Sequence, residues 1–197
     1  VVTLDDASIA ADMARSLVRG GLKIVEITLR TPAALRAIEV IAGRVPEITV
    51  AAGTVMSLED LRCAAAAGAS LAISPGATPT LLDECRDAEI PLLPGIATAS
   101  ELMAGLAAKY RCFKLFPAGA AGGIAVLKAF AAPCPQARFC PTGGITQDGA
   151  ASYLDLENVP CVGGSWITPP EALAHQDWPR IEALASRAAA LRTAAPR

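Results

Sequence analysis

The chain has 197 residues, of which 53% are hydrophobic and 18% charged, a composition typical of one folded, densely packed domain rather than of a disordered protein. Its net charge is −2 with acidic and basic residues interspersed, so it lacks the basic stripe that a nucleic-acid partner would require. The longest uncharged stretch, residues 63–82, contains two glycines and two prolines, and we therefore predict no membrane span.

The chain opens on the apolar residues VVTL without a methionine or a signal peptide, and we expect this first strand to be truncated at its N-terminus. Six cysteines are scattered along the chain without a CxxC pair. Several of them stand in apolar runs, where a thiol behaves as a small hydrophobic side chain. We expect reduced thiols and a cytoplasmic protein.

Further apolar segments follow at a near-regular interval, with successive starts 20 to 26 residues apart. They are LKIVEITL from residue 22, ITVAAG from 48, SLAIS from 70, IPLLPG from 90, RCFKLF from 111, ARFCP from 137 and PCVGG from 160. Helix-start signals follow most of these segments, namely Thr31 before Pro32, Ser57 with Asp60, Thr78 before Pro79, and Thr98 with Glu101.

Between a cap and the next apolar segment, hydrophobic residues fall at helical spacing, as at Leu35, Ile38 and Ile41, and Gly68 stands where a helix should end. Each unit is therefore a strand, a loop and a helix. Counting VVTL as the first strand gives eight strands, the number that closes a parallel barrel. We predict an α/β protein of the (β/α)8 TIM-barrel class, with residues 1–197 forming a single domain. An open doubly wound sheet would use about five strands.

The active site of such a barrel lies at the carboxyl ends of the strands, where the sequence places a lysine within an apolar run. Lys114 stands between Phe113 and Leu115 in the strand RCFKLF. One interpretation is an ammonium that reaches solvent on a stem lying along apolar surface. The alternative, which we favour, is a buried amine. Burial disfavours its charged form and leaves part of it neutral near pH 7, the form that attacks a carbonyl to give a Schiff base.

A second unusual position is Glu26, because strand alternation places its carboxylate on one face of a central strand. A buried carboxylate needs a partner, so one hypothesis is an internal ion pair with Arg30 or with Lys114. The functional hypothesis is a general acid and base close to the lysine. The two hypotheses are compatible, since Glu26 can pair with the ammonium in the resting state.

Glycine pairs follow the seventh and eighth strands, in TGGI from residue 142 and in GGSW from residue 163. These two loops bind phosphate through backbone N–H groups in many barrels. The only histidine, His175, lies beyond the last strand, which argues against a histidine triad or a histidine-rich metal site. Nucleotide-binding glycine motifs are absent as well. The pattern predicts amine chemistry on a phosphorylated oxo compound, without a cofactor or a metal.

Seven motifs resemble, in order and spacing, those of the 2-keto-3-deoxy-6-phosphogluconate (KDPG) aldolases, class I enzymes of the Entner–Doudoroff pathway. The motifs are VEITLRT, AAGTV, AISPG, PLLPGIAT, FKLFPA, FCPTGGI and GGSW. The resemblance implies a homotrimeric barrel that cleaves KDPG, a phosphorylated 2-oxo sugar acid, to pyruvate and glyceraldehyde 3-phosphate.

The resemblance also implies a role for individual residues. The family's lysine nucleophile falls on Lys114 and its proton-transferring glutamate on Glu26. The pyruvate carboxylate would be held by Arg30 and Thr54 in a pocket lined by Pro75 and Phe116, and the substrate phosphate by Gly143, Gly144, Gly163, Gly164 and Ser165. The family usually has a glutamate where this chain has Gly119, so a polar contact to the substrate tail is expected to be missing.

Three alternatives to a KDPG aldolase remain. The nearest is a sibling aldolase acting on 2-dehydro-3-deoxy-6-phosphogalactonate or on 4-hydroxy-2-oxoglutarate, because these substrates share the pyruvate half. A phosphosugar isomerase or synthase would need the phosphate loops but no buried lysine. A non-catalytic phosphosugar-binding barrel would bind phosphate without forming an adduct with pyruvate.

Overall fold

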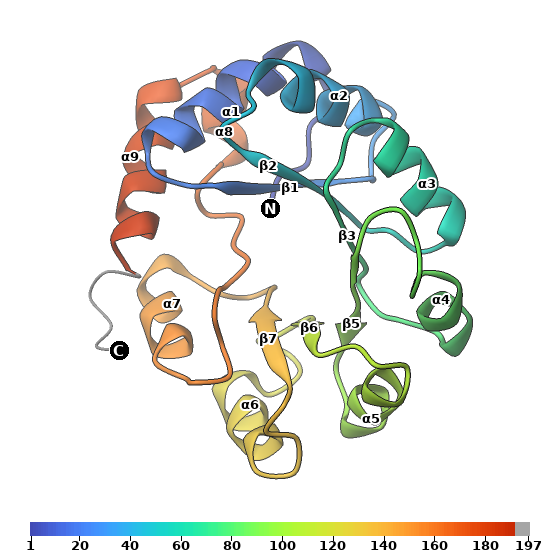
Figure 1. Cartoon of the computed structure of the whole chain (residues 1–197). Helices are drawn as coiled ribbons and strands as arrows, with labels where there is room; N and C mark the ends of the chain where they lie inside the picture. The colour runs from blue at the N-terminus through green and yellow to red at the C-terminus, as the bar shows by residue number, and fades with distance from the viewer. Residues whose placement is uncertain (192–197) are drawn as a thin grey trace.

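The computed structural model describes residues 1–191, in which short parallel strands stand in a ring with the helices around the outside (Figure 1). The strands pair in chain order as two sheets, β1-β2-β3-β4 and β5-β6-β7. Their bounds are β1 Ile24–Thr28, β2 Thr49–Gly53, β3 Leu71–Ile73, β4 Leu92–Leu93, β5 Gly95–Ile96, β6 Cys112–Leu115 and β7 Arg138–Pro141. Only Pro94 separates β4 from β5, so these two form the single strand expected from IPLLPG.

The first and eighth predicted strands are each reduced to one parallel bridge, and they close the ring. Val2 bridges Ile27 of β1, and Gly163 bridges Thr142 just after β7. The Val1 nitrogen then donates to the Gly164 carbonyl oxygen at 2.8 Å, which joins the two segments to each other. This closure and the alternating order of strands and helices agree with the predicted (β/α)8 barrel.

The helices alternate with the strands and cover their outer faces (Figure 1). Their bounds are the 3-10 turn η1 Ala7–Ile9, then α1 Ala10–Arg19, α2 Ala34–Arg44, α3 Leu58–Ala66, α4 Pro79–Glu84, α5 Ala99–Ala107, α6 Gly123–Ala131, α7 Gln147–Leu154, α8 Pro170–Ala174 and α9 Trp178–Ala190. Within residues 1–191, no helix is both long and apolar enough to cross a membrane.

Three of the four predicted helix starts are confirmed. The Ser57 and Thr78 hydroxyls accept from the backbone N–H groups of Asp60 and Leu81, and Thr98 forms a reciprocal capping box with Glu101. The prediction for Thr31 is wrong, because its hydroxyl donates to the Leu4 carbonyl oxygen and α2 begins only at Ala34.

The helix ends and faces follow the predicted pattern with one exception. Gly68 follows α3 with φ +94°, a conformation that favours glycine, as expected for a helix stop. Ile38 and Ile41 of α2 are fully buried, but Leu35 is 39% exposed, and the neighbouring Ala34 takes the buried position in the first turn. The helical spacing therefore predicts two of these three core positions correctly.

The apolar core lies between the strand ring and the helices in two clusters. One surrounds β1 to β4 with α1 to α4 and α9, and the other surrounds β5 to β7 with α5 to α7. Phe113 and Phe139, from neighbouring strands, lie at the centre of the second cluster with ring centroids 6.2 Å apart. Because this core packs the outer faces of the strands, side chains on the inner faces are left to build a site. That residues 1–197 form one domain stays a prediction, since residues 192–197 lie outside the described residues.

Candidate active site

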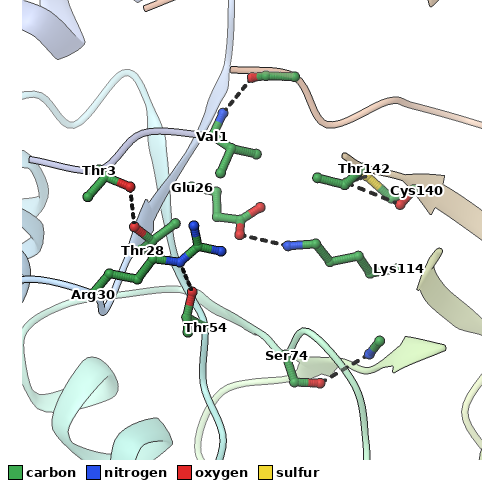
Figure 2. Close-up of polar contacts among 12 residues, drawn as sticks. Val1, Thr3, Glu26, Thr28, Arg30, Thr54, Ser74, Lys114, Cys140 and Thr142 are labelled. Carbon is green, nitrogen blue, oxygen red and sulfur yellow. Dashed lines mark hydrogen bonds and ion pairs between the residues drawn. The ribbon is translucent and has the colours of Figure 1, made fainter. Parts of the chain in front are cut away.

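A lysine and a glutamate meet inside the barrel. Lys114, on β6, places its Nζ atom 2.9 Å from Oε1 of Glu26, on β1, and the side chains are 6% and 9% exposed (Figure 2). The structure therefore rejects a Lys114 ammonium that reaches solvent, and it selects Lys114 rather than Arg30 as the partner of Glu26. A buried pair at this distance can pass a proton between nitrogen and oxygen with little movement, which suits acid and base chemistry.

The strands next to this pair leave room for its side chains. Gly53 of β2 stands beside Glu26, and a Cβ atom at Gly53 would come within 2.7 Å of the Glu26 Cγ atom and 2.8 Å of its carboxyl carbon. Gly95 of β5 is the strand partner of Lys114 and packs directly on the Pro75 backbone. Gly53 is therefore a positioning residue for the carboxylate, a role that the sequence pattern does not reveal.

We expect Gly53→Ala to lower kcat/KM by about 100-fold, the low end for a lost general acid or base, because the added methyl group pushes the Glu26 carboxylate away from Lys114. Steady-state kinetics with the substrate proposed below would measure this. Gly43→Ala is the matched control, since a Cβ atom there meets nothing within 4 Å. Equal activity of the two variants would contradict the positioning role.

Arg30 and Thr54 form the second contact of the site. Arg30 follows β1, and its Nε atom donates to the Thr54 hydroxyl oxygen at 3.1 Å (Figure 2). Thr54 adopts φ +63°, which is unusual for a β-branched residue and costs on the order of 1–3 kcal/mol. The strained turn after β2 therefore holds a hydroxyl against the guanidinium and fixes the direction of Arg30.

Removing this hydroxyl tests whether it orients Arg30. We expect Thr54→Val to raise KM by about fivefold with a smaller change in kcat, because Arg30 is largely exposed and the lost hydrogen bond is screened by water. Thr54→Ser, which keeps the hydroxyl, should retain the original KM. A Thr54→Val enzyme with unchanged KM would show that the contact is only structural.

The open end of the barrel forms a cavity of about 610 Å³ that leads to Lys114. Eight of the predicted site residues line it, which are Arg30, Lys114, Phe116, Gly143, Gly144, Gly163, Gly164 and Ser165. The Phe116 ring centroid lies 5.4 Å from the Lys114 nitrogen, so an apolar wall stands next to the amine. A ligand in this cavity would contact both the Lys114 amine and the glycine loops.

The surroundings of two glycine pairs, one after β7 and one in the eighth predicted strand segment, require glycine at these positions. Gly143 and Gly144 have φ values of +92° and +76°, a region that disfavours other residues. A Cβ atom at Gly163 would overlap Thr142, and one at Gly164 would overlap the Trp166 ring. These constraints explain the glycines by packing and backbone conformation, and they also leave the backbone open to the cavity.

Three predicted site residues do not line the cavity, and Pro75 is the one whose link to the site is weakest. Among the described residues, those lining the cavity do not include Pro75, Glu26 or Thr54. Glu26 and Thr54 still belong to the site through Lys114 and Arg30, whereas Pro75 only supports Gly95 from behind. A contact between Pro75 and substrate therefore remains a prediction without support from the cavity.

Gly119, where the motif departs from the expected glutamate, stands close to the glycine loop. Its N–H donates to the Gly143 carbonyl oxygen at 2.9 Å. A Cβ atom at Gly119 would make only ordinary contacts, the nearest at 3.6 Å. A larger side chain is therefore compatible with this backbone, and its absence removes one possible polar group beside Gly143 and Gly144.

Sequence reasoning missed part of the cavity wall. Residues 1–6 and the segment around α8 line it. Thr142, which the sequence already places at the end of a strand, lines it as well and is buried. The hydroxyl oxygens of Thr3 and Thr28 lie 2.7 Å apart and share a hydrogen bond. The rule that polar residues at or after strand ends build the site would have found Thr3, near the end of the first predicted strand, and Asp5 and Asp6, which directly follow it. Within residues 1–191, no cluster of three acidic, histidine or cysteine side chains could hold a metal ion.

Comparison with known proteins assigns the family. A family model described as KDPG and KHG aldolase matches residues 1–184. The 2-dehydro-3-deoxy-phosphogluconate aldolase of Dickeya dadantii is 48% identical over 194 residues, which cover 98% of this chain and 91% of the relative. This chain belongs to the KDPG and KHG aldolase family. The resemblance inferred from its motifs is thereby confirmed, and so is its place among the lyases.

Solved aldolases of this family share the fold. A KDPG aldolase from Legionella pneumophila, with pyruvate captured at low pH as a covalent carbinolamine intermediate, has a TM-score of 0.93 and 46% identity, covering 95% of this chain and 91% of that one. The aldolase of Zymomonas mobilis ZM4 with 3-phosphoglycerate has a TM-score of 0.92 and 42% identity, covering 99% of this chain and 92% of that one. The predicted aldolase barrel is confirmed.

Proposed function

We propose that this aldolase cleaves 2-dehydro-3-deoxy-6-phosphogluconate to pyruvate and glyceraldehyde 3-phosphate through a Schiff base on Lys114. The observation that carries the proposal is the buried contact of 2.9 Å between the Lys114 amine and the Glu26 carboxylate at the base of an open cavity. An amine next to a base is the arrangement that attack on a carbonyl requires. The carbinolamine described for the Legionella relative supports the same chemistry.

The first steps join the substrate to the enzyme. Transfer of a proton from Lys114 to Glu26 leaves a neutral amine, whose nitrogen attacks the C2 carbonyl carbon and forms a carbinolamine. Glu26 gives this proton to the carbinolamine hydroxyl group, which leaves as water, so that Glu26 is again a carboxylate and an iminium forms, whose positive nitrogen can accept an electron pair. Arg30, held in direction by Thr54, is the cation that would bind the C1 carboxylate and turn C2 toward the amine.

The next steps break the carbon chain. The Glu26 carboxylate removes the C4 hydroxyl proton, the C3–C4 bond breaks, and its electron pair moves to C3 to form an enamine while glyceraldehyde 3-phosphate leaves. Glu26 then returns the proton to C3. Water hydrolyses the resulting iminium, which releases pyruvate and restores the Lys114 amine. One carboxylate thus serves as base and then as acid.

The substrate phosphate would bind at the glycine loops of the cavity. Gly143, Gly144, Gly163, Gly164 and Ser165 line it, and the positive φ values of Gly143 and Gly144 form a turn of the kind whose backbone N–H groups suit an anion, whereas the Gly163 N–H already donates to the Pro141 carbonyl oxygen. The Zymomonas relative was solved with the phosphorylated acid 3-phosphoglycerate. A phosphorylated 2-oxo sugar acid would therefore extend from Lys114 to these loops.

Substrate preference separates the proposal from its nearest alternatives. The family description includes KHG aldolase, so 4-hydroxy-2-oxoglutarate is a second candidate substrate, and the C4 epimer 2-dehydro-3-deoxy-6-phosphogalactonate is a third. We expect a higher kcat/KM with the phosphogluconate substrate than with 4-hydroxy-2-oxoglutarate, because the phosphate loops contribute only to phosphorylated substrates. We expect it to exceed the value for the phosphorylated epimer as well, because the Dickeya relative is a 2-dehydro-3-deoxy-phosphogluconate aldolase. Pyruvate release, followed with lactate dehydrogenase, measures all three. A higher value for either competitor would reassign the substrate.

We also propose that the enzyme is a homotrimer in the cytoplasm. The trimer follows from the family resemblance, and Met56 and Met103, which leave 68% and 66% of their surface exposed, are available to a partner subunit. None of the six cysteines forms a disulfide within residues 1–191, which fits a reducing compartment. Light scattering should give three times the mass of one chain, and the mass of one chain would contradict the trimer.

A further inference from the structure

Two cysteines lie side by side in the barrel wall next to the active site. Cys140 is on β7, and Cys161 precedes the last bridge of the barrel. Two backbone hydrogen bonds bracket them, one from Phe139 N to the Asn158 carbonyl oxygen (2.8 Å) and one from Gly163 N to the Pro141 carbonyl oxygen (2.9 Å). Because Thr142 pairs with Gly163, the parallel register places Cys140 and Cys161, each two residues earlier, opposite each other on neighbouring segments.

The two thiols have different surroundings. Cys140 is the strand partner of Lys114, and its sulfur lies 3.9 Å from the Thr142 hydroxyl oxygen (Figure 2). The hydrogen bond with Cys161, burial and the negative charge of Glu26 raise the pKa of Cys140 well above its usual value. Cys161 is exposed and lines a second cavity of about 400 Å³ with Lys23 and Trp166. A small reagent can therefore reach Cys161, whereas Cys140 is less exposed and its raised pKa favours the protonated thiol.

The spacing of the two chain segments suits a disulfide. Neighbouring strands lie about 4.8 Å apart, and a disulfide needs Cα atoms about 4.4 to 6.8 Å apart. Because the register already places the two cysteines opposite each other, forming the bond needs only side-chain rotation and a small approach of the two segments.

We propose that Cys140 and Cys161 form a peroxide-sensitive pair whose reversible disulfide slows the reaction at Lys114. In the first step, a peroxide oxygen bonds to the Cys161 sulfur, the O–O bond breaks and water leaves, which gives a sulfenic acid. In the second step, the Cys140 sulfur displaces the hydroxyl group, which takes the Cys140 proton and leaves as water. Two thiols lose two electrons in total, and hydrogen peroxide is reduced to two waters.

The consequence for the site follows from the positions of the two residues. Thr142 comes two residues after Cys140, and Gly163 comes two residues after Cys161, so each cysteine directly precedes one glycine loop of the cavity. A disulfide draws the sulfurs to about 2.05 Å and moves both segments. A shift of about 1 Å in a positioned group can lower a rate by up to about 100-fold. We expect kcat/KM to fall by about 10-fold or more.

The test is oxidation of the full chain with a small molar excess of hydrogen peroxide, followed by blocking of remaining thiols with N-ethylmaleimide. Digestion without reduction and mass spectrometry should then find the Cys140 and Cys161 peptides joined, with the mass of two hydrogens lost. Pyruvate release should fall together with the appearance of this peptide and recover with dithiothreitol. The joined peptide is read by mass, so this result does not depend on the substrate proposed above.

Variants separate this pair from the other thiols. Cys161→Ser should keep its basal rate and resist peroxide, and Cys161→Ala provides a second variant with the same expectation. Cys134→Ser, with the substitution in the loop after α6, is the matched control and should remain as sensitive as the parent chain. Absence of the joined peptide, its formation without a slower reaction, or equal sensitivity of Cys161→Ser and the parent chain would each overturn the proposal.

Discussion

Lys114→Met is expected to abolish cleavage, because methionine fills a similar volume but has no nitrogen to form the iminium. Removal of a covalent nucleophile typically lowers kcat by roughly 10⁶-fold, so no turnover should be measurable. The same substitution leaves the Glu26 carboxylate buried at 9% exposure without its cation. An unpaired buried charge costs about 3–5 kcal/mol, so the free energy of unfolding should also fall.

Two further variants separate these effects. Lys114→Arg keeps a cation beside Glu26 but supplies no nucleophile, so it should be inactive and more stable than Lys114→Met. The double variant Lys114→Met with Glu26→Gln removes both charges and should recover much of the lost stability. Denaturant unfolding measures the stabilities, and pyruvate release measures the activity. Measurable cleavage by Lys114→Met at a rate near that of the parent would contradict the assignment of the nucleophile.

Glu26→Gln carries the second largest expected effect. Glutamine keeps the size of the side chain and can accept a hydrogen bond from Lys114, but it cannot take the C4 hydroxyl proton or return it to C3. We expect kcat to fall by ~10²–10⁴-fold, the range for a lost general acid or base, with a smaller change in KM. Stopped-flow and steady-state assays of pyruvate release would measure both constants.

A matched control for this substitution is Glu101→Gln, at the capping box of α5, whose carboxylate contacts Thr98 rather than Lys114. It should lower stability by about 1 kcal/mol and leave kcat unchanged. Exchange of the C3 protons of pyruvate with deuterium gives a second readout, because it requires the acid and base without carbon–carbon cleavage. Normal exchange and cleavage in Glu26→Gln would reduce Glu26 to a structural partner of Lys114.

The barrel was predictable because each of its signals is local. The inward position of Glu26, the capping box at Thr98 and the glycine after α3 each depend on a few neighbouring residues, and the structure confirms them. The predicted helix start at Thr31 is wrong because the contact that decides the role of its side chain is not local. Its hydroxyl donates to the Leu4 carbonyl oxygen, 27 residues away, and a contact of that range is not recorded in a cap pattern.

The site was predictable in its residue types but not in its contacts. An amine and a carboxylate on inner strand faces are visible in the sequence, yet Lys114 and Glu26 are 88 residues apart and their contact appears only when the barrel closes. The same closure brings residues 1–6 to the cavity wall. Gly53 is found only in the structure, because its role depends on the space taken by the Glu26 side chain on the neighbouring strand.

The most direct test of the Schiff base is reductive trapping of the chain with pyruvate and sodium borohydride, followed by digestion and mass spectrometry. We predict one added pyruvate-derived group on the peptide that contains Lys114, and none on the peptides that contain Lys23, Lys109 or Lys128. The Lys114→Arg variant should remain unmodified under the same treatment. An adduct on another lysine, or no adduct in the parent chain, would contradict catalysis through an iminium on Lys114.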